Sequence, residues 1–574
     1  MHPMNYRSSY EHQLELFGEI DTLPWRAIEP HVTPLPGQNA ATRSFNEMID
    51  FMPFYEMNEK GNFLVHDSVW GEEEIGTYEE DKVLLQLLHT PAMRRLMAIE
   101  QLTLPQGYET VPNTTMYKRF EHAWGSVVFV RKMIEKSPEL MSLSGHEKMV
   151  LQLRTFLSDF GHTAFSHLGD WVKQGFGGPE DAHDQKEETY RLLELSGVAE
   201  VLFHNGYALD EVFFPNVGER GDWVERSGKQ LCVDRVDFGV RQILRMFRDG
   251  YGDYRGIDLR ELLRFDKFEV VKGQLVMNDW FAASIFARLY AEMVLEHWQE
   301  PLHRGNLALF SEITRETLVA TDSVSNPVLN SQLLHPYDGL LSIDDDITSR
   351  DRMGRLQGHT FWRQTDFIMR NTGLERRLWF DDFRRSQLLE MIVGMPALAG
   401  KGEQQGIVWD PINTQGSDTR FNGTPPFVDV LEVTEDVRYG KIHPDLVTDD
   451  FLPTSDGLLV FLPHLKERWI DPEVIDRYDG EIKLLSQMGG FFDMFIGIVE
   501  KFQQRDFVIN YSMRRDNAQD IVQTIKASRT RWQEAMKRPR IEDEHDYQSY
   551  IEHVGSRAIA SAYPLQMLHP NIFD

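Results

Sequence analysis

The chain has 574 residues, of which 41% are apolar and 26% charged. This is the balance of a folded globular protein of several domains, and it excludes an intrinsically disordered chain. The 60 basic and 90 acidic residues give a net charge of -30. Such a charge repels phosphate backbones, so we do not expect long nucleic acid as a partner.

The cysteine count and the apolar segments indicate the compartment. A single cysteine, Cys232, excludes a disulfide framework and favours a reducing environment. No secretory signal opens the chain. The apolar segment 489–502 is short and carries Asp493, which is typical of a buried helix and not of a membrane span. We therefore expect a cytoplasmic protein without a membrane segment.

The first part of the chain predicts an arm, a hairpin and a pair of helices. Residues 1–60 are interrupted by several prolines, and we interpret them as an N-terminal arm. The alternating pattern of residues 62–76 predicts a short β hairpin. Residues 82–102 repeat apolar side chains at steps of three and four, with a break at Pro91.

Further helices are predicted at 117–136, 146–160, 185–195, 229–247 and 278–298. Gly161 is expected to cap the helix 146–160. At about 100° per residue, Asp159 falls at the edge of the apolar stripe of that helix and Ser158 on its far side. In the helix 229–247, Asp234, Asp237 and Arg241 share one face.

The remaining chain predicts a change of structure after residue 395. Helices continue to that point, and glycines and prolines between 400 and 426 then mark a boundary. Strand patterns follow at 426–433 and 457–463, and a helical tail is predicted from 480 to 536. We expect a mainly α fold with small β hairpins. Its core covers 61–395, and a mixed α/β region at 396–574 forms a lid or an oligomer contact.

Common nucleotide and hydrolase signatures are absent. The sequence has no GxxxxGK[ST], GxGxxG or GxSxG motif, and one cysteine cannot form a CxxC zinc site. What remains is histidine and aspartate on predicted helices. They are densest in LSDFGHTAFSHLGD, residues 157–170, which contains Asp159, His162, His167 and Asp170.

Six segments in a fixed order carry a resemblance to a known family. They are HDSVWGEEEIG with TPAMRRLMAIEQL, then RFEHAWGS, LSDFGHTAFSHLGD, DAHDQKEE, CVDRVDFGVRQ and PYDGLLSIDDDI. From about residue 64 to 349 the chain resembles the HD-domain phosphohydrolases, specifically their deoxynucleoside triphosphate triphosphohydrolase branch. The resemblance implies an HD-type helical core, a nucleotide ligand and a homo-oligomer.

The resemblance also implies roles for individual residues. His122, Asp159 and Asp234 fall on metal-ligand positions. His162, Asp170 and His183 fall on positions for proton transfer or contact with the reacting phosphate. The positions that bind substrate match Gln101 for the sugar, and Arg119, Arg235 and Arg288 for phosphate. A divalent ion polarises a phosphoryl oxygen and activates water; Mn, Fe, Mg, Zn and Ni all stay open.

Three positions depart from the family pattern. Ser158 replaces the histidine that names the family, and a neutral hydroxyl is a poorer ligand than imidazole for a transition metal. Phe238 and Gln242 stand where the branch usually has tyrosine and aspartate. Three functions therefore stay open: a metal-dependent phosphohydrolase acting on a nucleotide, a catalytically impaired nucleotide-binding or regulatory protein, and an HD-type phosphodiesterase.

Each candidate also has a structural alternative. His122 is also explained as a hydrogen-bonded core histidine, and His162 as part of the turn at Gly161. Asp234 is explained equally by a salt bridge to Arg241 at helical spacing. Asp170, which precedes a tryptophan, is explained as a surface residue.

Overall fold

The computed structural model describes the chain in segments separated by gaps. The described residues are 54–57, 63–75, 79–101, 104, 117–174, 186–213, 223–226, 228–248, 258–294, 298–320, 336–344, 360–374, 428–432, 450–462, 469–489, 497, 507–539 and 544–561. The expected arm, residues 1–60, lies outside these segments except for residues 54–57, which form a strand, and the expected boundary at 395 lies outside them entirely. Within them, no helix is long and apolar enough to cross a membrane.

The fold is mainly helical with small sheets, as the sequence predicts. The longer helices are α3 (Lys82–His89), α5 (Arg119–Lys136), α7 (Gly145–Phe156), α9 (Lys186–Leu195), α12 (Val233–Arg248), α14 (Trp280–Met293), α15 (Pro301–Ala320), α19 (Thr360–Leu374), α23 (Arg515–Ala535) and α24 (Glu544–Ser561). The shorter ones are α4 (Pro91–Arg95), α6 (Pro138–Met141), α8 (Leu168–Gln174), α10 (Val198–His204), α11 (Leu209–Phe213), α13 (Leu259–Leu262) and α16 (Pro336–Gly339).

Three small sheets accompany these helices. The first is the antiparallel sheet β1 (Phe54–Met57), β2 (Phe63–Asp67) and β3 (Gly71–Ile75). The second has the order β10-β9-β5-β4, with β4 (Phe268–Val271), β5 (Gln274–Met277), β9 (Glu473–Ile475) and β10 (Ile482–Leu484). The third has the order β6-β11-β8-β7, with β6 (Val428–Glu432), β7 (Phe451–Pro453), β8 (Gly457–Leu462) and β11 (Phe507–Ser512).

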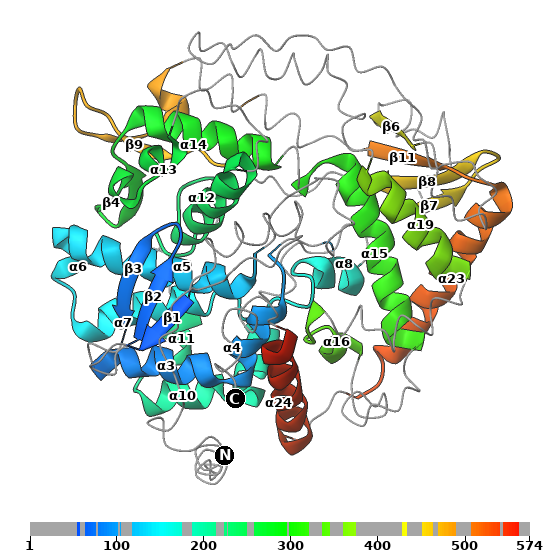
Figure 1. The fold of residues 1–574 in the computed structure, drawn as a ribbon, viewed down its shortest axis with the longest axis horizontal. Coiled ribbons are helices and arrows are strands. Elements are labelled where there is room, and N and C mark those ends of the chain that lie inside the picture. The colour runs from blue at the N-terminus through cyan, green and yellow to red at the C-terminus, as the bar shows by residue number, and fades with distance from the viewer. Residues whose placement is uncertain are drawn as a thin grey trace, which may run out of the picture.

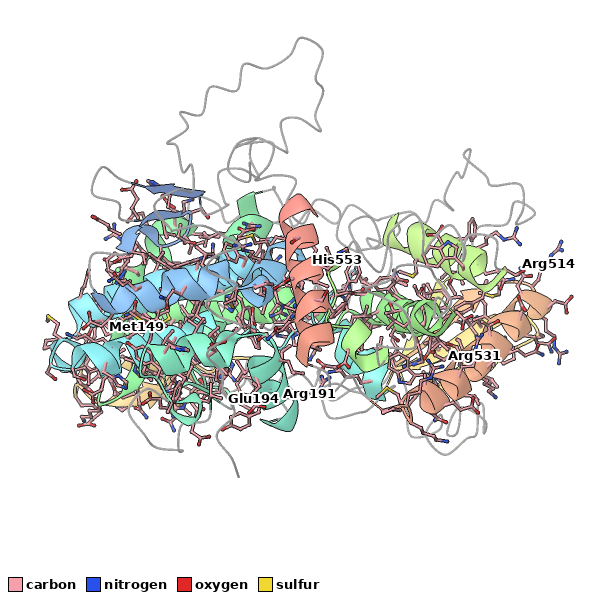
Figure 2. All side chains as sticks on the ribbon, turned by 90° about the horizontal axis from the view of Figure 1, so that it is seen from below. Met149, Arg191, Glu194, Arg514, Arg531 and His553 are labelled. Atoms are coloured by element: carbon pink, nitrogen blue, oxygen red, sulfur yellow. The ribbon has the colours of Figure 1, made fainter. Side chains whose placement is uncertain are left out.

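The elements form two lobes (Figure 1). One lobe gathers α3 to α7 and α9 to α14 with the first two sheets, and the other gathers α8, α15, α19 and α23 with the third sheet. Each lobe has its own cluster of buried apolar side chains. The last helix, α24, lies between the lobes, and Figure 2 shows His553 on α24 between Met149 of the first lobe and Arg531 of the second.

Close contacts fix α24 against the first lobe. Gly555 lies so near α4 that a Cβ on it would lie 2.7 Å from the Cα of Pro91. Arg191 of α9 donates two hydrogen bonds to Asp338 of α16, at 2.7 and 3.1 Å. The guanidinium carbon of Arg191 also lies 5.4 Å from the ring centroid of Tyr547 on α24. The C-terminal helix is therefore part of the wall around the first lobe.

Two of the predicted elements are wrong in extent. The helix predicted at 146–160 ends at Phe156, with Leu157 and not Gly161 as its cap. Residues 157–161 form tight turns instead, because the buried Arg95 draws in the carbonyl groups of Phe160 and His162. The helical tail predicted from 480 to 536 contains β10 and β11, and among its described residues, 480–489, 497 and 507–536, the long helix is α23.

The chemistry of β11 explains the second error. Its sequence FVINYS is rich in β-branched and aromatic residues, which favour strands. It pairs with β6 on one side and β8 on the other, so it is a central strand buried by both neighbours. The hairpin β2–β3 and the strands β6 and β8 lie where the sequence predicts them.

Candidate metal centre

His122 lies in the first turn of α5 and is fully buried. That turn begins at a fixed place because the backbone N–H of Lys118 donates to the Glu121 carboxylate, at 3.0 Å. A bridge between Glu100 and Lys118 ties the start of the helix to the preceding segment. The imidazole therefore projects from a rigid helix start into the interior of the first lobe.

Two carboxylates from distant parts of the sequence meet at this imidazole. The Nε2 atom of His122 lies 3.0 Å from Oδ1 of Asp234 on α12 and 3.8 Å from Oδ2 of Asp159. One ligand atom from each of the three lies within 4.8 Å of the others. An imidazole nitrogen and two carboxylate oxygens suit a divalent metal ion. This His/Asp/Asp group could therefore hold such an ion.

Asp159 reaches the group from the turn that follows α7. The guanidinium of Arg95, 1% exposed, donates to the carbonyl oxygens of Phe160 at 3.1 Å and His162 at 2.5 Å. Burial lowers the pKa of Arg95 to about 10, so it remains a cation at neutral pH. A buried cation that binds two carbonyl groups on either side of Gly161 fixes the direction of the Asp159 side chain.

The Asp159 carboxylate also binds two groups expected to contact substrate. Its Oδ1 lies 2.7 Å from Nη1 of Arg119 and 3.3 Å from Nε2 of His162. Arg119 donates from Nε to the Ser166 hydroxyl as well, at 2.8 Å. Arg119 is therefore held beside the metal group by an ion pair and a hydrogen bond.

The other face of His122 is held by a second aspartate on α12. Its Nδ1 lies 2.7 Å from Oδ2 of Asp237, whose Oδ1 accepts from the indole of Trp70 at 2.5 Å. Arg241 donates to both oxygens of Asp237, at 3.1 and 2.8 Å, and to Asp67 at 2.9 Å. This buried chain orients the ring so that Nε2 faces Asp159 and Asp234, as partners of metal-ligating histidines usually do.

The charges in this chain shift one another. Burial alone would raise the pKa of Asp237, but Arg241 and His122 hold it below its ordinary value. Burial raises the pKa of Asp67, and Arg241 only partly offsets this. For His122, burial acts to lower the pKa, but Asp159, Asp234 and Asp237 together raise it to about 10. A metal ion at Nε2 would therefore have to displace a proton.

Ser158 is not one of the three grouped residues. Its hydroxyl donates to the backbone carbonyl of Thr155, at 2.9 Å, and so completes the hydrogen bonding at the end of α7. The side chain is half-buried. The metal group therefore consists of the three residues that the family pattern retains, without its central histidine.

His162 begins a second short row of polar groups. Its ring lies edge-to-face with that of His167, with 4.7 Å between centroids, and Nδ1 of His167 lies 3.2 Å from Asp170. Asp170 is 8% exposed, so the interpretation as a surface residue is wrong. Histidines titrate near neutral pH and can move protons, and this row leads directly to Asp159.

The backbone between these histidines is strained. Phe165 and Ser166 have φ angles of +53° and +58°, a conformation that non-glycine residues rarely adopt. The Ser166 hydroxyl donates to the carbonyl of Glu100 and lies 3.1 Å from that of Gln101, while accepting from Arg119. The backbone of Gln101 therefore lies near Arg119, and the predicted contact of Gln101 with a sugar stays a prediction. Such strain is concentrated at functional sites in proteins.

The remaining predicted site residues, Arg235, Arg288 and His183, are not members of the His122, Asp159 and Asp234 group. Arg235 uses its guanidinium to bind the carbonyls of Gln230 at 2.7 Å and Arg226 at 2.6 Å. Arg288 is half-buried on α14. His183 lies outside the described residues.

The two remaining departures from the family pattern occupy apolar or buried places. Phe238 packs edge-to-face 6.3 Å from the His122 ring and 5.2 Å from that of Trp298. Gln242 is 1% exposed, and no hydrogen bond forms to either end of its amide within the described structure. Neither residue offers a charge at the metal group.

Three residues of this centre are not assigned a role by sequence reasoning: Asp67, Trp70 and Arg95. Asp67 and Trp70 could have been noticed from the HDSVW segment, in which Asp67 ends the predicted strand and Trp70 follows in the turn. Nothing in the sequence distinguishes the fully buried Arg95 from the half-buried Arg94 beside it, because burial of an arginine depends on the tertiary fold.

The space for Arg241 generates a stability prediction. A Cβ on Gly125, on α5, would lie 1.7 Å from Nη2 of Arg241 and 2.6 Å from Oδ1 of Asp237. We expect Gly125→Ala to lower the free energy of unfolding by about 1–3 kcal/mol, measured by urea denaturation. The exposed Glu135→Ala on the same helix is the control and should change it little. Equal stability of the two variants would contradict this packing.

Comparison with solved structures gives matches that include two of low sequence identity. The sequence matches no protein-family model and no curated protein. One similar solved structure is a phosphohydrolase from Bacteroides thetaiotaomicron VPI-5482, with 14% identity, a TM-score of 0.45, and coverage of 78% of this chain and 99% of the other. Another is a hypothetical protein from Aquifex aeolicus, with 14% identity, a TM-score of 0.42, and coverage of 84% and 100%.

Proposed function

We propose that this chain is a metal-dependent phosphohydrolase acting on a nucleotide, most simply one that removes triphosphate from a deoxynucleoside triphosphate. The observation that carries the proposal is the meeting of His122, Asp159 and Asp234 from three segments far apart in sequence. The nucleotide is supported by the ordered family-like segments of the sequence, in which these three residues occupy metal-ligand positions.

The residues present fit a divalent ion. His122 offers Nε2 as a ligand atom. Asp159 and Asp234 each offer a carboxylate oxygen within 4 Å of that atom. Three protein ligands leave coordination positions for substrate and water. When bound, such an ion would polarise a phosphoryl oxygen and lower the pKa of a water molecule.

The surrounding side chains supply orientation and proton transfer. Asp237 holds the His122 ring in place through Nδ1. Arg119, fixed by Asp159 and Ser166, contributes a guanidinium suited to phosphate oxygens. His162 lies next to Asp159 and can accept a proton there, and its ring packs edge-to-face against His167, which contacts Asp170.

An activity assay tests the proposal. The full chain is incubated with deoxynucleoside triphosphates and Mn²⁺ or Fe²⁺, and released triphosphate and phosphate are separated by ion exchange. Because Asp159 contributes a ligand and holds Arg119, we expect Asp159→Asn to reduce the rate at least about 100-fold. The exposed Glu139→Gln is the control. An unchanged rate in Asp159→Asn contradicts the assignment, and turnover only of bis(p-nitrophenyl) phosphate indicates a phosphodiesterase.

The role of Asp237 gives a prediction on metal affinity. Asp237→Asn removes the carboxylate that orients His122, so we expect Mn²⁺ affinity to fall about 10- to 100-fold, measured by calorimetry. Asp67→Asn is a matched control, because it disturbs the same Arg241 without touching His122. We expect Asp67→Asn to reduce stability but to change Mn²⁺ affinity much less. Equal losses of affinity in both variants would contradict the orienting role.

A second candidate is a catalytically impaired protein that binds nucleotides. Three observations favour it: the Ser158 hydroxyl binds backbone instead of facing the group, Arg235 binds backbone carbonyls, and Phe238 is packed among aromatic rings. Such a protein would bind nucleotide without turnover and would hold metal weakly.

Replacement of Ser158 distinguishes the two candidates. In an impaired protein, Ser158→His would add an imidazole beside Asp159 and should strengthen Mn²⁺ binding about tenfold or more, with turnover appearing only in the variant. Ser158→Ala is the control, because it also removes the bond to Thr155 but adds no ligand. Full turnover by the unsubstituted chain would exclude the impaired candidate.

A further inference from the structure

A segment late in the chain is built into the lobe that carries the metal group. Strand β9 pairs antiparallel with β10 and continues the core sheet through a parallel contact between Val474 and Met277 of β5. Trp469 and Val474 are buried in the same apolar cluster as α5 and α12. The segment 469–485, which we call the C-terminal clip, is therefore part of this lobe although it follows the rest of the lobe by nearly 200 residues.

The C-terminal clip contacts one loop, residues 223–232, of which residue 227 lies outside the described structure. Glu473, only 4% exposed, accepts from Nη1 of Arg226 at 2.8 Å and from the backbone N–H of Leu231 at 3.0 Å. The backbone N–H of Asp471 donates to the carbonyl of Lys229, at 2.8 Å. The Lys229 ammonium lies 3.8 Å from the ring centroid of Trp469. Four contacts thus join the two segments.

The loop 223–232 leads directly into the first turn of α12, which carries Asp234. The N–H groups at a helix start have no partner within the helix. Here the N–H of Val233 donates to Trp223 at 2.9 Å, and that of Asp234 to Val224 at 3.4 Å. Arg235 binds the carbonyls of Gln230 and Arg226 from the other side. The position of Asp234 therefore follows the position of the loop.

Asp234 is also the ligand that depends most on such support. Its side chain is 27% exposed, whereas those of His122 and Asp159 are 0% and 6% exposed. The two buried ligands are held by their own polar contacts, His122 by Asp237 and Asp159 by Arg119. The position of the more exposed Asp234 depends on its backbone. The buried Glu473 carboxylate holds the loop before that backbone through Arg226 and Leu231.

We infer that Glu473 is a positioning residue for Asp234, and that docking of the C-terminal clip completes the metal group. This inference rests on the proposed function for its metal, but not for its geometry. The carboxylate of Glu473 neutralises Arg226 and binds Leu231, so the loop remains closed and Asp234 remains within reach of His122.

The test compares Glu473→Gln with Asp479→Ala in the full chain. Glutamine keeps an oxygen for the Leu231 N–H but loses the charge that binds Arg226. Asp479 is an exposed carboxylate of the same clip, paired with Lys483, and does not touch the loop. Two quantities are measured: the Mn²⁺ dissociation constant, and hydrogen exchange of residues 231–236 in metal-free protein by mass spectrometry.

In Glu473→Gln we expect the Mn²⁺ dissociation constant to rise about tenfold and exchange at 231–236 to quicken selectively, with exchange in α5 unchanged. Asp479→Ala should leave both quantities as in the original chain. A variant with a lower Tm but unaltered Mn²⁺ affinity and loop exchange would show a merely structural role and overturn the inference. If the unsubstituted chain binds no Mn²⁺, the proposed function fails, while the exchange measurement still decides whether Glu473 holds Asp234.

Discussion

The contact between Asp237 and His122 is the constraint on which the rest of this lobe depends. A buried charge is costly unless it is paired and hydrogen-bonded. Each side chain in the row His122, Asp237, Arg241 and Asp67 has such a partner. The chain links a strand of the first sheet, α5 and α12. Gly125 leaves the room it needs, so a glycine within a helix, usually a weakness, is required at this place.

The opposite wall of the centre is held by different means. Arg95 binds the carbonyls around Gly161, and the buried Asp344 accepts from the backbone N–H groups of Glu100 and Phe165, at 2.7 and 2.6 Å. Burial raises the pKa of Asp344 to about 7, against the opposing effect of Lys118. These two charged residues stabilise a turn that contains strained backbone at Phe165 and Ser166. The left-handed residues persist because the surrounding bonds determine their positions.

Much of the helical framework follows from periodicity, but the centre does not. The apolar repeats predict α3, α5, α9 and α14, and helical spacing predicts that Asp237 and Arg241 meet. The grouping of His122 with Asp159 and Asp234 came from resemblance, since spacing within one helix says nothing of contacts between helices. Arg95 and Glu473 could not be recognised, because their importance arises from burial against residues far along the chain. The helix end at Phe156 was missed for the same reason: Arg95 stabilises the turns that follow.

The second lobe contains a feature with consequences for how the molecule is made. Helix α15 buries charges: Glu312 accepts from Arg529 of α23 at 2.7 Å and also binds Arg315, which in turn donates to the carbonyls of Trp171 and Val172 in α8. The helix that bears Asp170 is therefore braced by a side chain near the end of the chain. Because Glu312 leaves the ribosome 217 residues before Arg529, it stays without this partner for more than a third of synthesis. Contacts of such sequence separation form slowly, so the support that α23 gives to α15, and through Arg315 to α8, is completed only after α23 has been made.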